Sequence, residues 1–286
     1  MTDKQYNKGD LKLELSDYFF SREDFRLYEN KEFGYLETRP QPDDLSFYYE
    51  SEEYISHTDA TKSRIEKLYA FVKNFNIRYK FAKLKNVQPG KKLLDYGCGT
   101  GDFLVFAQNQ KLKVFGFEPN GFAFNIAQKK LNNSHVFNQP NEVFDQQYDV
   151  ITLWHVLEHI PDLLAFVEEL KTLLKPEGKI YIAVPNHLSF DAKFYRNYWA
   201  AYDVPRHLWH FSPESVHKLF NSFGMKIEKQ FPLWFDSYYV SILSEKYKKT
   251  KWGFLRAFFI ASWSNLSGIF TGNYSSIIYQ ISKNEN

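Results

Sequence analysis

From Thr61 onward, apolar and polar positions follow the periods of alternating helices and strands. Apolar residues recur at helical spacing from Ile65 to Ala82, which predicts one long helix ending before Pro89-Gly90. The segments that follow alternate between the expected strands KKLLDY, KVFGFE, HVF, YDVITLW and KIYIAV and the expected helices DFLVFAQNQ, AFNIAQKKL and LLAFVEELKTLL. KIYIAV is apolar at almost every position, which is typical of a strand buried on both faces of a parallel sheet. This alternation predicts an α/β fold with right-handed crossovers.

Two boundaries after this region have clear signals. We expect the turn Lys175-Pro176-Glu177-Gly178 to close the helix before KIYIAV. Ser212 precedes Pro213 at the start of a further helix, which Gly224 ends.

Residues 1–60 lack this regularity. Their aromatic side chains cluster without a clear period, and Pro40 and Pro42 interrupt the segment, so we expect loops and short turns. We therefore divide the chain into an N-terminal cap, 1–60, and a main domain, 61–286, with insertions at 187–212 and 236–270.

The composition is that of an ordinary globular protein. Of the 286 residues, 44% are hydrophobic and 24% are charged, so the chain can bury a core. The net charge is +2 and no basic block is long enough to follow a phosphate backbone, so we expect no nucleic acid partner. The polar N-terminus predicts no signal peptide, and the single cysteine, Cys98, precludes an internal disulfide. Both features favour a cytoplasmic protein.

A glycine-rich turn follows the first strand after the long helix. In LDYGCGTGDF the strand ends at Asp95, and Gly97, Gly99 and Gly101 precede the next helix. Glycine permits a tight turn and the close approach of a ligand to the backbone. The free amides at the start of a helix attract an anionic group. The segment therefore predicts a binding site for a ligand with an anionic group.

Glu118 lies 21 residues after Gly97, at the end of the next strand. A doubly wound fold places a carboxylate there to bind ribose hydroxyls. Dinucleotide sites have the spacing G-x-G-x-x-G, whereas this chain has G-x-G-x-G after an acidic residue, which favours the methionine moiety of S-adenosylmethionine. A glycine turn without a ligand and an NAD-dependent dehydrogenase remain open as alternatives.

Four segments resemble, in order and spacing, the class I S-adenosylmethionine-dependent methyltransferases, in the branch that includes the ubiquinone-biosynthesis O-methyltransferases. They are LDYGCGTGDFL, FGFEPNGFAFNIAQ, YDVITLWHVLEHIPD and LLKPEGKIYIAVPN, within residues 85–230. The resemblance implies a doubly wound, seven-stranded, mostly parallel sheet whose last strand is antiparallel. GMKIEKQF and SSIIYQIS would be its final two strands.

The resemblance also implies which residues bind S-adenosylmethionine and its product S-adenosylhomocysteine. By position these are Asp95, Tyr96, Gly97, Cys98, Gly99, Glu118, Pro119, Asn141, Trp154 and His155. Asn141 would lie near the adenine, although Pro140 before it has no amide to donate. Trp154 and His155 would lie where the methyl group is transferred.

The string HVLEH places His155, Glu158 and His159 within five residues. It matches the H-x-x-E-H string of inverted zinc proteases, but that chemistry needs a sustained helix and Pro161 follows at once. Related O- and RNA-methyltransferases carry E-x-x-E-H here and bind a divalent ion. Because His155 replaces the first carboxylate of that set, we expect no metal, and expect His155 to line the pocket.

A second cluster, YDVPRHLWHFS, contains Asp203, Arg206, His207 and His210. In the fold that the chain resembles, this segment lies beside the methyl donor. His207 could therefore take a proton from an acceptor hydroxyl, since histidine titrates near working pH. Alternatively, Arg206 pairs with Asp203 and the histidines only pack. We name His155 and His207 as the candidate catalytic residues.

Similar proteins often hold a zinc ribbon with a C-x-x-C-G string before the long helix. Here Asn30 and Phe33 occupy the cysteine positions before Gly34, so this segment lacks the thiolates for zinc, and we expect an aromatic core in its place.

Residues 236–270 combine large apolar side chains with Lys248, Lys249, Lys251 and Arg256. Such a basic amphipathic helix could rest on a membrane surface, cover a lipid-like substrate or pack on its own domain, and we favour the last.

The acceptor is not encoded in a motif, but aromatic residues make up 19% of the chain. The candidates for an acceptor pocket are Tyr48, Tyr54, Tyr198, Trp199, Trp209, Trp234, Phe235 and Tyr238. Tyr48, Tyr54 and His57 belong to a segment that we expect either to fold over the cofactor or simply to pack on the protein. A pocket of such aromatic residues favours a flat or apolar molecule. The sequence thus predicts O-methylation of a small or lipid-like acceptor. The alternative from another class is a protein that binds S-adenosylmethionine without turnover.

Overall fold

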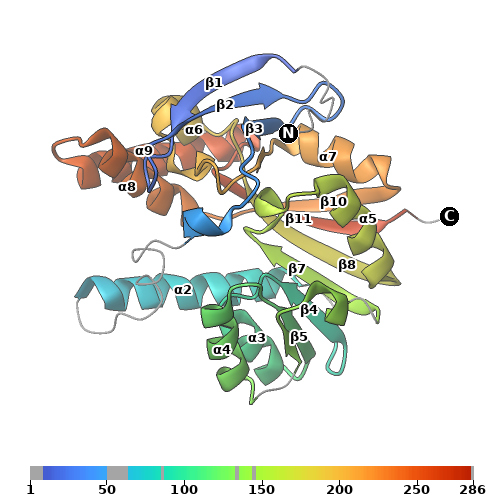
Figure 1. Cartoon of the computed structure of the whole chain (residues 1–286). Helices are drawn as coiled ribbons and strands as arrows, with labels where there is room; N and C mark the ends of the chain where they lie inside the picture. Colours follow the sequence, from blue (N-terminus) through green and yellow to red (C-terminus); the bar gives the residue numbers. More distant parts are fainter. Residues whose placement is uncertain (1–8, 50–63, 85–86, 133–134, 144–145, 285–286) are drawn as a thin grey trace.

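The computed structural model describes residues 9–49, 64–84, 87–132, 135–143 and 146–284. Within them, seven strands form a central sheet in the order β10-β11-β8-β7-β4-β5-β6 (Figure 1). Their bounds are β4 (Lys92–Tyr96), β5 (Lys113–Phe117), β6 (Val136–Phe137), β7 (Tyr148–Trp154), β8 (Leu174–Pro185), β10 (Met225–Pro232) and β11 (Ser276–Lys283). The pairs from β6 to β8 are parallel, and β11 runs antiparallel to β8 and β10. The doubly wound sheet with an antiparallel last strand is confirmed.

Helices cover both faces of this sheet. The main ones are α2 (Arg64–Lys83), α3 (Asp102–Asn109), α4 (Gly121–Lys130), α5 (Leu163–Leu173) and α7 (Pro213–Ser222). In β8, Ile180 and Ile182 belong to the core under α5 and α7, whereas Tyr181 and Ala183 belong to the core under α2, α3 and α4. Successive strand residues point to opposite faces, which explains why KIYIAV is apolar throughout.

One predicted helix boundary is confirmed and one predicted turn is wrong. The Ser212 side chain accepts a hydrogen bond from the Ser215 amide, and Pro213 begins α7. The segment Lys175–Gly178, expected as a turn, belongs instead to β8. Tyr148 of β7 pairs with Leu174 of β8, and Val150 pairs with Lys179, so two steps along β7 correspond to five steps along β8. A bulge therefore absorbs the proline and the glycine within the strand.

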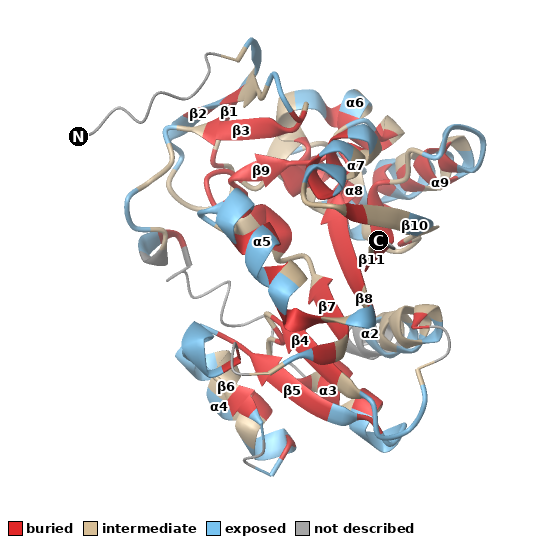
Figure 2. Ribbon diagram, turned by 90° about the vertical axis from the view of Figure 1, so that its right-hand side faces the viewer, coloured by how far each residue is buried: buried red, intermediate tan, exposed pale blue. Residues whose placement is uncertain are grey.

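The expectation of loops in the N-terminal segment is also wrong. It contains β1 (Leu11–Ser16), β2 (Asp24–Glu29) and β3 (Leu36–Arg39), which form an antiparallel sheet completed by β9 (Trp209–His210). In LKLELS and DFRLYE, apolar residues alternate with polar ones, and Leu15, Phe25 and Leu27 are buried (Figure 2). Since β9 comes from the insertion at 187–212, the cap and that insertion share one sheet.

Aromatic side chains pack at the position where a zinc ribbon would have its cysteine thiolates. The Asn30 Oδ1 accepts hydrogen bonds from the amides of Glu32 and Phe33, at 3.0 Å each. Phe33 stacks on Tyr35, with ring centroids 5.8 Å apart. Tyr35 meets Trp209 edge-on, so the turn is fixed by an asparagine and an aromatic core.

The rest of the cap is described only in part. Tyr48 lies in the short helix η1 (Ser46–Tyr49), is buried, and donates its hydroxyl to Glu23. Tyr54 and His57 lie outside the described residues.

The two insertions form a helical layer beside the N-terminal sheet (Figure 1). The first contains α6 (Phe190–Tyr195), η4 (Arg196–Tyr198) and η5 (Ala200–Tyr202), and the second contains α8 (Asp236–Lys248) and α9 (Gly253–Thr271). In the described part of the chain, no helix combines the length and apolar character that crossing a membrane requires.

Candidate active site

Backbone hydrogen bonds fix the glycine loop at the carboxyl end of β4. The amides of Gly97 and Cys98 both donate to the Phe117 carbonyl at the end of β5, at 2.8 and 2.9 Å. Gly97 has a φ of 75°, and a Cβ there would lie 2.5 Å from Val156 Cγ2. The chain conformation and the neighbouring side chain therefore both require glycine at this position.

Glu118 connects the loop to the next strand. Its carboxylate accepts hydrogen bonds from the Gly99 amide at 2.8 Å and the Asn120 amide at 3.0 Å. Burial raises the pKa of this carboxyl group, although the two hydrogen bonds from backbone amides act to lower it. A carboxylate has about four lone-pair sites, so two hydroxyl groups can still bind to Glu118 while it orders the loop.

Asp95 lies at the end of β4 and is 1% exposed. Thr152 of β7 donates its hydroxyl to the carboxylate at 2.6 Å. Burial raises the Asp95 pKa to about 7, and this outweighs the Thr152 hydrogen bond and the nearby Lys80 ammonium, which lower it. A buried carboxylate at this point suits a cationic ligand group.

The raised pKa predicts that Asp95→Asn stabilises the unliganded protein at alkaline pH. The folded state holds the Asp95 proton up to about pH 7, whereas the unfolded chain loses it near 3.8. Wild-type stability therefore falls as pH rises between these values. Three pKa units correspond to about 4 kcal/mol, which the variant should regain at pH 8 but not at pH 4. Urea unfolding at both pH values checks this, and equal stabilities at pH 8 would contradict it.

The other expected cofactor residues lie in different surroundings. The Tyr96 ring packs in the core between Phe117 and Phe166, so only its backbone can reach a ligand. Cys98 is buried, and burial raises its thiol pKa. Pro119 and Asn141 are exposed, and Asn141 lies in η2 (Pro140–Val143) after β6.

Trp154 and His155 end β7. The buried Nε1 of Trp154 has no hydrogen-bond partner among the described residues. His155 has a φ of 61° and contacts two carboxylates, with Nδ1 3.3 Å from Glu158 and Nε2 2.9 Å from Asp236. Burial lowers its pKa, but the hydrogen bonds to Asp236 and Glu158 outweigh this and raise it to about 9. His155 is therefore cationic at neutral pH, which disfavours it as a base.

The sequence analysis missed two charged residues of this site. Asp236 begins α8 and bonds to His155 across 81 residues of chain. Lys80 of α2 places its ammonium 4.9 Å from the centre of the Trp154 ring, and burial lowers its pKa. Asp236 could have been noticed at the start of the insertion, but neither residue belongs to a motif.

The two histidine clusters meet through His159. HVLEH forms a single turn, η3 (Leu157–His159), rather than the sustained helix that a zinc protease requires. The His159 Nδ1 lies 3.0 Å from the Arg206 carbonyl, and the His159 and His207 rings meet edge-on at 4.6 Å. The segment after β8 therefore lies against the loop after β7.

His207 is nearly buried. Its Nδ1 lies 2.9 Å from the Ala201 carbonyl, so we assign the proton to Nδ1. Nε2 is then the basic nitrogen, 4.0 Å from Asp203. This tautomer lets His207 accept a proton at Nε2.

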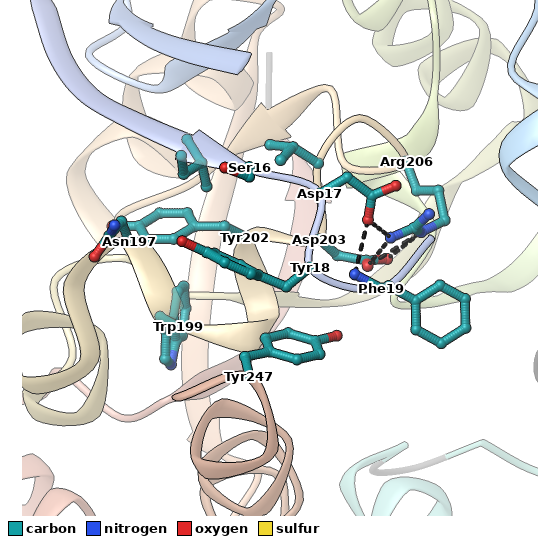
Figure 3. Close-up of a pocket in the computed structure, with 12 residues that line it drawn as sticks. Ser16, Asp17, Tyr18, Phe19, Asn197, Trp199, Tyr202, Asp203, Arg206 and Tyr247 are labelled. Carbon is teal, nitrogen blue, oxygen red and sulfur yellow. Dashed lines mark hydrogen bonds and ion pairs between the residues drawn. The ribbon is translucent and has the colours of Figure 1, made fainter. Parts of the chain in front are cut away.

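Arg206 has a structural role. Its guanidinium lies between Asp17 and Asp203, at 3.0 and 2.6 Å (Figure 3). Asp17 belongs to the turn after β1, so this ion pair attaches the N-terminal sheet to the segment that carries His207. A cavity of about 10 Å³, lined in part by Trp199 and Tyr247, lies beside it. It is about the size of one water molecule.

Glu158, His159 and His207 come close enough to hold a metal ion. One ligand atom from each lies within 4.8 Å of the others, and Glu158 Oε2 is buried without a partner among the described residues. No sequence pattern indicates that His207 lies beside Glu158 and His159 of HVLEH. Two histidines and a carboxylate are donors that Zn²⁺ accepts.

We predict that the purified protein is zinc-free and that EDTA leaves its activity unchanged. The reason is that Glu158 already pairs with the cationic His155, which competes with a metal for the carboxylate. Elemental analysis and activity assays after EDTA treatment check this. Stoichiometric zinc, or activity lost to EDTA and restored by magnesium, would show that the cluster is a metal site.

Sequence comparison identifies relatives of the main domain. The methyltransferase domain family matches residues 70–230. A ubiquinone biosynthesis O-methyltransferase from Acinetobacter baylyi is 30% identical over 34% of this chain and 44% of its own length. A demethylmenaquinone methyltransferase from Staphylococcus saprophyticus is 29% identical over 41% of this chain and 54% of its own length. The chain spans about half the length of the curated relatives it matches.

Solved structures share the fold at low identity. A magnesium protoporphyrin IX methyltransferase from Synechocystis PCC 6803 with bound SAH has a TM-score of 0.53 and 14% identity, over 83% of this chain and 97% of that chain. A cyclopropane synthase from Mycobacterium tuberculosis has a TM-score of 0.51 and 17% identity, over 82% of this chain and 88% of that chain. These similarities establish the class I methyltransferase architecture.

Proposed function

Because the chain belongs to the methyltransferase domain family, we propose that it transfers the methyl group of S-adenosylmethionine to a hydroxyl group of a small or lipid-like acceptor. The observation that carries the proposal is the loop Gly97–Gly101, held by Glu118 beside the buried Asp95. These groups lie at the carboxyl ends of β4 and β5, where a doubly wound sheet binds ligands.

The residues at this edge fit S-adenosylmethionine. The amino end of α3, which follows the loop, would attract the methionine carboxylate, Asp95 would take the amino group, and Glu118 would take the ribose hydroxyls. The unpartnered Nε1 of Trp154 supplies a further donor. We retain Pro119 and Asn141 as cofactor residues, with Asn141 at the adenine end, where its exposure leaves space for a ring.

On the acceptor side, His207 acts as the base. S-adenosylmethionine supplies an electrophilic methyl group on a sulfonium. His207 Nε2 takes the proton of the acceptor hydroxyl, whose oxygen forms the new bond to carbon as the carbon–sulfur bond breaks. Orientation contributes much of such a rate, and His155, held by Asp236 and Glu158, fixes the loop after β7.

The acceptor is proposed from the aromatic residues next to Asp236. Phe235 meets Phe75 of α2 edge-on at 5.1 Å, and Tyr238 lies against Phe258 of α9. Trp199 and Trp209, expected in the same pocket, are instead buried core residues whose indoles donate to Asp191 and to a backbone carbonyl. The names of the relatives point to quinone-related acceptors, and we infer the same class here.

A screen of acceptors tests this function. The purified chain is incubated with methyl-labelled S-adenosylmethionine and phenols, quinols, sugars or carboxylic acids. We expect label in phenols or quinols, recovered as methyl ethers. Turnover of sugars without turnover of aromatic or lipid acceptors would contradict the acceptor class. A cytoplasmic location and the lack of a nucleic acid partner remain predictions from composition.

A further inference from the structure

In helix α9 the buried side is small or polar and the exposed side is mostly apolar, which is the reverse of an ordinary surface helix. The residues it buries are small or polar: Ala257, Ala261, Ser264, Asn265 and Gly268. Apart from Arg256, which pairs with Glu245, and Thr271, the residues it exposes are large and apolar: Phe254, Leu255, Phe258, Phe259, Trp263, Leu266, Ile269 and Phe270, which are 44% to 82% exposed. A helix that faced only water would carry polar residues on that side.

The small residues hold α9 closely on the protein. Ser264 donates its hydroxyl to Asp191 of α6 at 2.6 Å, and Asn265 donates to the Trp234 carbonyl at 2.9 Å. A Cβ on Gly268 would lie 2.5 Å from the Tyr274 ring. The inner side is therefore specifically packed, and these contacts fix the orientation of the apolar side.

Basic residues flank the apolar side at the turn between α8 and α9. Lys246, Lys249 and Lys251 are exposed there, beside Trp252, which is 84% exposed. The sequence has no Asp or Glu from residue 246 to residue 284. The end of the helical pair thus carries positive charge next to an exposed indole.

We propose that α9 lies flat on an anionic lipid surface, with its exposed side in the interface and the lysine turn against lipid phosphates. A helix of nineteen residues is about 28 Å long. A large apolar side with tryptophan and flanking lysines is the composition of interfacial helices. A second copy of this chain fits less well, because its α9 segment has no carboxylate to offer these lysines. The proposal does not depend on the proposed methyl transfer.

Vesicle flotation tests this proposal with the full chain. Phosphatidylcholine vesicles are compared with vesicles that also contain phosphatidylglycerol. We expect the protein to float with the phosphatidylglycerol vesicles, and high salt to reduce this. The double variant Phe259→Asp, Phe270→Asp should lose binding by more than about tenfold per side chain. Lys249→Gln with Lys251→Gln, which removes two positive charges, should lose roughly thirtyfold on the anionic vesicles.

Phe122→Asp is the matched control, since Phe122 is 48% exposed on α4, which lies elsewhere on the molecule. It should bind vesicles as the wild type does, and circular dichroism should show that all variants are folded. The proposal is overturned if the wild type stays unbound to both vesicle types, or if the Phe259/Phe270 double variant binds normally. Light scattering that shows a dimer broken by the double variant, without vesicle binding, would assign the surface to a second copy instead.

Discussion

Replacing Glu118 by alanine is expected to weaken S-adenosylmethionine binding by roughly a hundredfold to ten-thousandfold. The ribose loses two charge-assisted hydrogen bonds, each worth about 1.5 to 3 kcal/mol. Glu118 also holds the Gly99 amide at 2.8 Å, so the loop loses its order in the same variant. Calorimetric titration of the purified variant measures the loss.

Two further variants separate these effects. Glu118→Gln keeps an oxygen for the loop amides but loses the charge, so its affinity should lie between those of wild type and alanine variant. Glu177→Ala removes an exposed glutamate at the bulge of β8 and should bind as the wild type does. Unchanged affinity in Glu118→Ala would remove Glu118 from the site.

Replacing His207 by alanine is expected to lower kcat about a hundredfold to ten-thousandfold, the usual contribution of a general base. Affinity for S-adenosylmethionine should change little, because the cofactor residues we propose lie in other segments, at the ends of β4, β5 and β7 and after β6. His207 is assigned this role because its Nδ1 bonds to the Ala201 carbonyl and Nε2 can accept the proton. Steady-state rates across pH, with the acceptor found in the screen, measure the effect.

His217→Ala is the matched control for this variant. His217 lies on α7 and bonds to Gln230 at the surface, so its loss should leave kcat and the pH profile unchanged. Full activity of His207→Ala at every pH would show that another group, or none, removes the proton.

The main domain could be predicted because its signals are local. A buried parallel strand such as KIYIAV is apolar throughout, and the loop Gly97–Gly101 has a spacing that one strand and one helix determine. The short strands of residues 11–39 were missed although LKLELS alternates apolar and polar positions. Their core is completed by Tyr195, Trp199 and Tyr202, far later in the chain, and a sheet packed against such distant segments leaves only a weak local pattern.

The chemistry of the site was harder to predict than its location. The spacing places Asp95 and Glu118 at adjacent strand ends, as found. The protonation of His155 depends on Asp236, which no motif connects to HVLEH. Likewise, the approach of His207 to Glu158 needs the folded path of the segment after β8. Electrostatic partners of this kind follow from tertiary structure alone.

The most direct test of methyl donor use is calorimetry of the full chain with S-adenosylmethionine, S-adenosylhomocysteine and NAD. The arrangement of Asp95, the glycine loop and Glu118 predicts saturable binding of the first two at one site, and none of NAD. Tight binding of NAD, with no heat from S-adenosylmethionine, would contradict the methyltransferase assignment.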